Sequence, residues 1–396
     1  MNLSGKVVIV GAARTPIGAF LGQLKEATAT ELGACAIAGA LARSKMPPES
    51  IDEVCMGCVL PAGLGQAPAR QAALAAGLPE STGCVTVNKM CGSGMKAIML
   101  AHDALRAESA HAIVAGGMES MSNAPYLLER ARGGYRMGHG KLVDHMFLDG
   151  LEDAYEKGRL MGSFAEDCAK KYQFTRKEQD DYAIASLTRA RRAAAEGAFD
   201  AEIAPMRIAG RKETRTIDAD ETPHRANLDE IPKLKPAFLP DGTITAANAS
   251  SISDGAAALV LTTENAAFSR GLVPLATIVG HATHAAAPRE FPTAPIGAIE
   301  KLFQHVGWGR EDVDLFEINE AFAVVVMAAM KDLDLSQAKV NVHGGGCALG
   351  HPIGASGARI VVTLLAALKR YGLRRGVAAL CIGGGEATAL AIERAI

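Results

Sequence analysis

The chain has 396 residues, a formal net charge of −2, and a composition that is 49% hydrophobic but only 5% aromatic. This length allows two or three domains with an aliphatic core, and the near-neutral charge gives no general electrostatic reason to bind nucleic acid or an anionic membrane. The eight cysteines do not look like a disulfide framework, and no stretch reaches the roughly 18 to 20 apolar residues that span a bilayer, so we expect a cytoplasmic protein.

The first 120 residues alternate predicted strands and helices. Short β-branched runs predict buried strands, and stretches with helical spacing predict helices. In chain order these segments are 6–11 (strand), 28–44 (helix), 51–60 (strand), 66–77 (helix), 84–88 (strand) and 112–117 (strand). Such alternation is typical of a layered α/β domain.

The next stretch, 121–250, is more charged and richer in loops. It contains one clear helix, in which Thr175 and Glu178 have the spacing of a capping box and Gly197 follows the last turn. We interpret 121–250 as a loop domain inserted into the first α/β unit. A strand at 255–263 then returns to that unit, so that the first half comprises 1–120 plus 251–273.

From residue 274 the first pattern is repeated. "LATIVGHATHA" corresponds to "VVIVGAARTPI", "IGASGARIVVTLLAAL" to "MCGSGMKAIMLAHDAL", and "AALCIGGGEA" to "AIVAGGMES". This internal repeat predicts a second half, 274–396, that packs against the first about a pseudo-dyad. The starts of the two repeated helices, at Cys91 and at its counterpart Gly354, should then meet near one centre.

Cys91 lies at the start of an apolar helix in "VNKMCGSGMKAIML". Unpaired N–H groups and the positive end of the helix dipole favour a thiolate there. Gly92 and Gly94 leave the sulfur sterically open. These features predict a nucleophile, although the segment alone is equally compatible with a small buried core thiol.

Three more candidates come from the second half. His351 precedes Pro352 at the start of the repeated helix and could take the proton of the Cys91 thiol. Cys381 ends a strand before three glycines, and Asn319 in "INEAF" could hold a water or a carbonyl group. His351 and Cys381 also have structural alternatives, as a turn histidine and a core thiol.

Six motifs together resemble the thiolase family, and its acetoacetyl-CoA branch most closely. They are "NKMCGSGMKAI", "AGGMESMSNAPY", "ITAANASSISDGAAA", "EINEAF", "GHPIGASGARI" and "CIGGGEA". The resemblance runs through nearly the whole chain in the right order. It implies the α/β thiolase fold, in which two duplicated halves form a five-layered sandwich (α-β-α-β-α) with an inserted loop domain.

The resemblance also implies roles for the candidate residues. Cys91 would carry the acetyl group, His351 would activate it, and Cys381 would be the acid and base at the α-carbon. Asn319 would position a water, and the N–H groups of Gly383 and Cys91 would form an oxyanion hole. Substrate contacts would come from Ser250, Arg225, Met161, Phe322 and Ala249. No metal and no separate cofactor is implied, since coenzyme A is substrate and product.

The implied reaction is the reversible condensation of two acetyl-CoA molecules to acetoacetyl-CoA and CoA, within fatty acid metabolism. The implied partners are acyl-CoA substrates and further copies of the chain. The resemblance implies a dimer or a tetramer and favours the homotetramer. Three alternatives stay open: a broad-chain 3-ketoacyl-CoA thiolase, a Cys-His thioester hydrolase, and a non-catalytic acyl-CoA carrier. Leu160, Pro223 and Glu386 depart from common family patterns. Leu160 leaves the substrate branch open, Pro223 gives no basis for predicting a potassium requirement, and Glu386 should cause only modest tuning.

Some polar residues are interpreted as structural. Cys55 and Cys58 have the spacing of a redox or zinc pair, but no second pair accompanies them, and both fall in a predicted core strand. His281, His284 and His343 are likewise expected to have structural roles.

Overall fold

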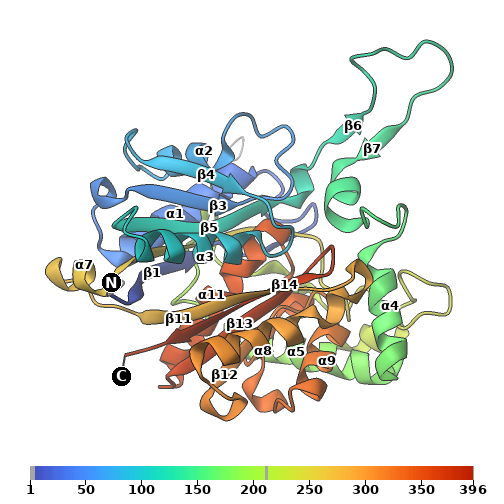
Figure 1. The fold of residues 1–396 in the computed structure, drawn as a ribbon. Helices are drawn as coiled ribbons and strands as arrows, with labels where there is room; N and C mark the ends of the chain where they lie inside the picture. Colours follow the sequence, from blue (N-terminus) through green and yellow to red (C-terminus); the bar gives the residue numbers. More distant parts are fainter. Residues whose placement is uncertain (1–4, 210–212, 396) are drawn as a thin grey trace.

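The computed structural model describes residues 5–209 and 213–395. A mixed sheet of ten strands runs through the described molecule (Figure 1). Its strands are β1 (Val7–Arg14), β2 (Gly18–Ala19), β3 (Glu53–Gly57), β4 (Gly83–Val87), β5 (Ala112–Ser120), β10 (Ser253–Thr263), β11 (Ala276–Ala285), β12 (Leu315–Ile318), β13 (Arg375–Ile382) and β14 (Glu386–Glu393). Along the main path the order is β12-β13-β14-β11-β1-β10-β5-β3-β4, and β2 pairs with β10.

The helices form three layers around these strands. They are α1 (Ala29–Ser44), α2 (Pro68–Ala75), α3 (Ser93–Arg106), α4 (Met161–Tyr172), α5 (Arg176–Ala195), α6 (Glu221–Arg225), α7 (Glu264–Ser269), α8 (Ala294–Val306), α9 (Ala323–Asp332), α10 (Gly346–Leu349) and α11 (Ile353–Arg370). Helices α1 and α2 cover one outer face, α8 covers the other, and α3 and α11 pack against each other between the two groups of strands. The α-β-α-β-α order implied by the resemblance is confirmed.

Side-chain alternation along β1 shows how one strand serves two layers. Val8 and Val10 join the apolar cluster under α1, whereas Val7 and Ile9 join the cluster around α3 and α11. Successive side chains of a strand point to opposite faces, so both faces are apolar in a strand covered on both sides.

The two halves meet in the sheet as well as in the helices. β1 pairs with β11 through three residue pairs, Val7–Ile278, Val8–Thr277 and Ile9–Ala276, and this joins the strands of both halves into one sheet. β10 lies between β1 and β5. The exact division into two halves and an inserted domain stays a prediction.

Glycines let the starts of α3 and α11 cross at backbone contact. A Cβ atom on Gly94 would lie 2.8 Å from the amide nitrogen of Ala358, and one on Gly357 would lie 2.4 Å from that of Met95. Real Cβ atoms do not approach this closely, so a larger residue at either position would push the helices apart. The starts of α3 and α11 can meet at one centre, as the repeat predicts, because glycine occupies both contact positions.

The segment between β5 and β10 surrounds this centre on one side. It carries α4, α5 and α6, the hairpin of β6 (Tyr126–Leu128) and β7 (Leu142–Asp144), and the hairpin of β8 (Met206–Ala209) and β9 (Thr214–Ile217). The first hairpin projects well beyond the body of the molecule (Figure 1). The capping box of Thr175 and Glu178 begins α5 as expected, and Gly197 has a φ of +66° just after the helix.

Two other predictions concern the whole chain. All eight cysteines, each of them in the described part of the chain, are free, and Cys55 and Cys58 are buried. Within the residues that the structure describes, no helix combines the length and apolar character needed to cross a membrane.

Candidate active site

A cavity of about 430 Å³ opens where the starts of α3 and α11 meet the end of β13. Eight of the ten predicted site residues line it: Cys91, His351, Cys381, Gly383, Ser250, Ala249, Met161 and Phe322. They come from both halves and from the inserted segment. The remaining two, Asn319 and Arg225, are not part of the cavity lining.

A tight turn places Cys91 beside β13. Met90, just before it, has a φ of +47°, a backbone conformation that costs about 1–3 kcal/mol in a residue other than glycine. Ser93 supports the turn, since its Oγ accepts the Lys89 N–H at 2.8 Å and donates to the Met90 carbonyl at 2.6 Å. A Cβ atom on Gly92 would lie 2.4 Å from Ile382 Cδ1, so glycine there lets the turn approach the strand.

Burial sets the charge of Cys91. It raises the pKa of the thiol to about 11, while hydrogen bonds from the N–H groups of Gly383 and of Cys91 itself oppose the rise and the nearby Glu119 carboxylate adds to it. The thiolate that the helix start alone would favour is therefore not the resting form, and acyl transfer needs a base. The two N–H groups that reach the sulfur are those that the resemblance assigns to an oxyanion hole.

His351 has the protonation state of such a base. Ser356 Oγ donates to the Pro352 carbonyl at 3.0 Å and lies 2.5 Å from His351 Nδ1. With the serine proton on the Pro352 carbonyl, Oγ is an acceptor for an Nδ1 proton, and in that tautomer Nε2 is an acceptor. Nε2 is buried and has no hydrogen-bond partner among the residues that the structure describes. Burial, assisted by the charge of Arg359, lowers the pKa of His351 to about 3, so the ring is neutral.

We expect Ser356→Ala to lower kcat by about 10- to 100-fold, well below the ~10⁴-fold cost of losing an orienting carboxylate. The substitution removes the acceptor that holds His351 in the Nδ1–H tautomer, while KM for acetyl-CoA should change little. Steady-state kinetics across pH measure both parameters. Ser44→Ala is the matched control, since Ser44 is also buried but its hydroxyl bonds to backbone groups at the end of α1. Equal kcat values for Ser356→Ala and the unmodified enzyme would contradict the tautomer argument.

Cys381 lies at the end of β13 with its side chain 1% exposed. Burial raises the pKa of its thiol far above the usual range, and the negative charge that Cys91 carries as a thiolate raises it further. The two sulfurs therefore interact electrostatically across the cavity. Both rest as thiols, and a proton can be exchanged at either.

Asn319 is fully buried, two residues before Ala321, which lines the cavity. Its Oδ1 accepts a hydrogen bond of 3.4 Å from Arg359, which fixes the amide so that Nδ2 points away from the arginine. Nδ2 is buried and finds no hydrogen-bond partner within the described ranges, an arrangement that an ordered water would satisfy. Arg225, by contrast, is exposed and pairs with Glu221 on α6. The predicted roles of both residues stay predictions.

Two interactions near the cavity were not predicted. The Glu119 carboxylate at the end of β5 accepts the N–H groups of Val59, Leu60 and Gly354 at 2.9, 3.1 and 2.9 Å, which ties the start of α11 to the first half. Burial raises the pKa of Glu119 to about 7, although these three hydrogen bonds oppose the rise. A lone acid at the end of an otherwise apolar strand is the sequence signal that could have identified it.

The second is an ion pair between Lys89 and Glu386. It links the turn before Cys91 to the residue that follows the GGG segment. Glu386, noted from the sequence only as a departure from the family pattern, therefore bridges the turn before Cys91 and the turn after Cys381.

The histidines interpreted as structural, His281, His284 and His343, do not line the cavity. His343 is buried, stacks edge-on against Phe199 at 5.9 Å, and its Nε2 lies 3.2 Å from the Tyr371 hydroxyl. Burial, with the charge of Arg370, lowers the pKa of His343 to about 4.

We expect His343→Phe to flatten the acid side of the stability profile. The pKa of His343 in the folded state lies below its value of about 6.5 in the unfolded state. The contribution of His343 to the free energy of unfolding is therefore complete above pH ~6.5 and is lost as the pH falls towards 4. The loss of unfolding free energy between pH 7 and pH 5 should shrink by about 2 kcal/mol, measured by urea denaturation at both values. His351 acts in the same direction and remains in the variant. Identical slopes would show that His343 does not titrate as its burial implies.

Comparison with known proteins agrees with this geometry. The thiolase N-terminal domain matches residues 7–265, and the thiolase C-terminal domain matches residues 272–394. Acetyl-CoA acetyltransferase 2 of Arabidopsis thaliana is 51% identical over 390 residues, which is 98% of this chain and 96% of the relative.

A bacterial relative and a solved structure extend the comparison. The acetyl-CoA acetyltransferase of Escherichia coli (strain K12) is 49% identical over 389 residues, 98% of each chain. The crystal structure of the Bacillus anthracis acetyl-CoA acetyltransferase matches with a TM-score of 0.97 at 43% identity and covers 100% of both chains. The two thiolase domains match in the expected order and together cover nearly the whole chain, and the solved structure shares its fold. This chain therefore belongs to the thiolase family.

Proposed function

We propose that the chain is an acetyl-CoA acetyltransferase, which reversibly condenses two acetyl-CoA molecules to acetoacetyl-CoA and CoA. The observation that carries the proposal is one cavity with two thiols, Cys91 and Cys381, and a neutral His351 whose Nε2 is free to accept a proton. Relatives of about half identity over nearly the whole chain bear this enzyme name.

The first half-reaction transfers the acetyl group to the enzyme. His351 Nε2 takes the proton of Cys91 as the sulfur attacks the thioester carbonyl. The N–H groups of Cys91 and Gly383 stabilise the oxyanion, and each such donor is typically worth about 2.7–4 kcal/mol of barrier. The CoA sulfur then leaves and takes a proton from Cys381, so that CoA departs as the free thiol.

The second half-reaction forms the carbon–carbon bond. The Cys381 thiolate takes a proton from the α-carbon of a second acetyl-CoA. Protonated His351 and a water on Asn319 stabilise the enolate oxygen. The carbanion attacks the acetyl carbon on Cys91, and the released sulfur regains its proton from His351. Cys91, His351 and Cys381 have then all regained their starting protonation states, and the net result is transfer of one proton from the α-carbon to the CoA thiol. Because the enzyme groups end as they began, the same steps can run in reverse.

Contacts to coenzyme A itself follow from the cavity lining. Ser250 Oγ donates to the Ala321 carbonyl at 2.9 Å, which leaves its lone pairs free to accept an amide N–H of the pantetheine arm. Ala249 forms an isolated bridge with Phe322, and this holds the loop with Ser250 at the cavity. Arg225 lies outside the cavity lining, where we propose contact with the nucleotide end of the ligand.

Bulky side chains around the cavity favour a short acyl chain. Phe147, Leu160, Phe238 and Phe291 are among the lining residues. Rates of CoA-dependent cleavage of acetoacetyl-CoA and of a long-chain 3-ketoacyl-CoA test the proposal. We expect the short substrate to be preferred; a strong preference for the long chain would indicate the broad-chain enzyme, and hydrolysis without transfer to CoA would indicate a hydrolase.

We further propose that the chain forms a homo-oligomer, a dimer or a tetramer. β4 lies at the edge of the described sheet, and an uncovered strand edge can pair with a second copy. The projecting β6–β7 hairpin carries exposed apolar side chains, with Met137 94% and Leu142 68% exposed. Free cysteines throughout fit a cytoplasmic enzyme, and the reaction fits fatty acid metabolism.

A further inference from the structure

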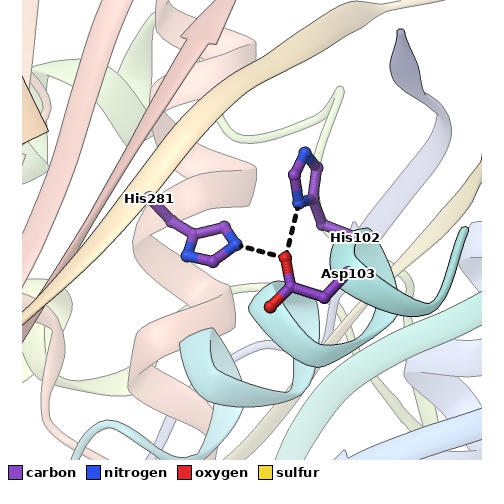
Figure 2. A group of neighbouring side chains, drawn as sticks. All are labelled: His102, Asp103 and His281. Carbon is purple, nitrogen blue, oxygen red and sulfur yellow. Dashed lines mark hydrogen bonds and ion pairs between the residues drawn. The ribbon is translucent and has the colours of Figure 1, made fainter. Parts of the chain in front are cut away.

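A His–Asp–His cluster lies where α3 passes β11, outside the cavity lining (Figure 2). His102 and Asp103 belong to α3, and His281 belongs to β11. Asp103 Oδ1 lies 3.1 Å from His102 Nδ1 and 2.9 Å from His281 Nε2. Figure 2 shows both imidazole rings turning a nitrogen towards this one oxygen. Two segments far apart in the sequence therefore converge on a single carboxylate.

The spacing of these atoms suits a transition-metal ion. One candidate ligand atom from each residue lies within 4.8 Å of the others, which no other group of three or more such side chains achieves in the described part of the chain. Zinc binds imidazole nitrogen and carboxylate oxygen at about 2.0–2.2 Å, so ligand atoms around a tetrahedral ion are about 3.3–3.5 Å apart. The two observed separations are only slightly shorter. With small movements of the side chains, an ion could take the place of the protons that the ring nitrogens now share with Asp103 Oδ1.

We propose that His102, Asp103 and His281 bind one divalent transition-metal ion of the zinc class, with a water molecule as fourth ligand. Two imidazoles and one carboxylate favour zinc over magnesium or calcium, which prefer oxygen ligands. The Asp103 side chain is 55% exposed, which gives the ion an entry path and leaves room for the water.

The position of this site assigns it a structural role. His102 lies nine residues after Ser93, about 14 Å along the helix at 1.5 Å per residue. The ion would link α3, which follows Cys91, to β11 of the second half, and would take no part in acyl transfer. Its binding should therefore stabilise the contact between the two halves.

Titration of the EDTA-treated enzyme with ZnCl₂ by calorimetry tests the proposal. We expect Asp103→Asn and His281→Gln each to lose one zinc equivalent or to weaken it by at least about tenfold. His139→Gln, at an exposed histidine near the tip of the β6–β7 hairpin, is the matched control and should keep every equivalent. Since thiols also bind zinc, Cys91→Ala identifies any ion held in the cavity. If Asp103→Asn binds as many equivalents as the unmodified enzyme, or if Cys91→Ala alone removes all binding, the proposal is wrong.

Two further measurements identify the ligands and the role. Co²⁺ bound at this site should show the visible absorption of a four-coordinate ion without a thiolate charge-transfer band, and Asp103→Asn should abolish that absorption. Zinc should raise the thermal unfolding midpoint of the unmodified enzyme and of His139→Gln but not of Asp103→Asn. A thiolate band in the cobalt spectrum, or an equal thermal shift in Asp103→Asn, would refute the assignment.

Discussion

Cys91→Ala should abolish both covalent acetylation and acetyl transfer, lowering the condensation rate by at least about 10⁴-fold. The substitution removes the one sulfur that receives hydrogen bonds from the Gly383 N–H and its own N–H. Intact-protein mass spectrometry after incubation with acetyl-CoA should show one added acetyl group on the unmodified chain and none on the variant. A non-catalytic carrier would bind acetyl-CoA without any covalent label on either.

Cys35→Ala is the matched control for this experiment. Cys35 is also a free, half-buried thiol, and burial raises its pKa to about 11, the same value as for Cys91. It is not among the cavity residues, and its sulfur donates to the carbonyl groups of Ala204 and Pro205. We therefore expect full acetylation and full activity in Cys35→Ala. Acetyl label that persists in Cys91→Ala would mean that another nucleophile carries the group.

Cys381→Ala should separate the two half-reactions. The variant should still accept an acetyl group on Cys91, but condensation should fall by about 10²- to 10⁴-fold, the usual contribution of a general acid or base. Exchange of the acetyl-CoA methyl protons with deuterated water, followed by NMR, reports the missing step directly. This exchange should become undetectable in the variant.

The control for this substitution is another cysteine of the same apolar cluster. Cys168 on α4 belongs to the cluster that contains Cys381, and burial raises its pKa to about 12. Cys168→Ala should retain proton exchange. Normal exchange in Cys381→Ala would remove its proposed role as the base, whereas loss of exchange in both variants would indicate damage to the packing.

The internal repeat predicted the part of the fold that positions the site. Cys91 and His351 lie at the equivalent starts of α3 and α11, and Cys381 lies near the glycine-rich end of β13. The repeat therefore predicts that all three meet near one centre. The expected helix at 28–44 is α1 (Ala29–Ser44). Its boundaries were predictable because a capping box at Thr28 defines the start locally.

Elements that depend on distant partners were not predictable. Strand β14 (Glu386–Glu393) was missed because alanine and glutamate have low strand propensity, and pairing with β11 and β13 on its two sides stabilises it instead. Phe147 and Phe238, which line the cavity, were missed because one lies in a short π-helix (Phe147–Leu151) and the other in a loop, and neither segment shows a periodic pattern. The neutral resting state of the Cys91 thiol could not be predicted from the neighbouring sequence, because the burial of this thiol depends on β13, which belongs to the other half.

Helix α11 has a consequence for synthesis on the ribosome. Residues 353–365 are all buried, and the helix packs against β5 and β10 of the first half as well as β12 and β13 of the second. A nascent chain that has emerged only as far as β11 therefore exposes the apolar faces of β5 and β10 that α11 later covers. Chaperones are expected to bind such an exposed apolar surface. Premature termination before this helix yields an aggregation-prone fragment rather than a weakened enzyme.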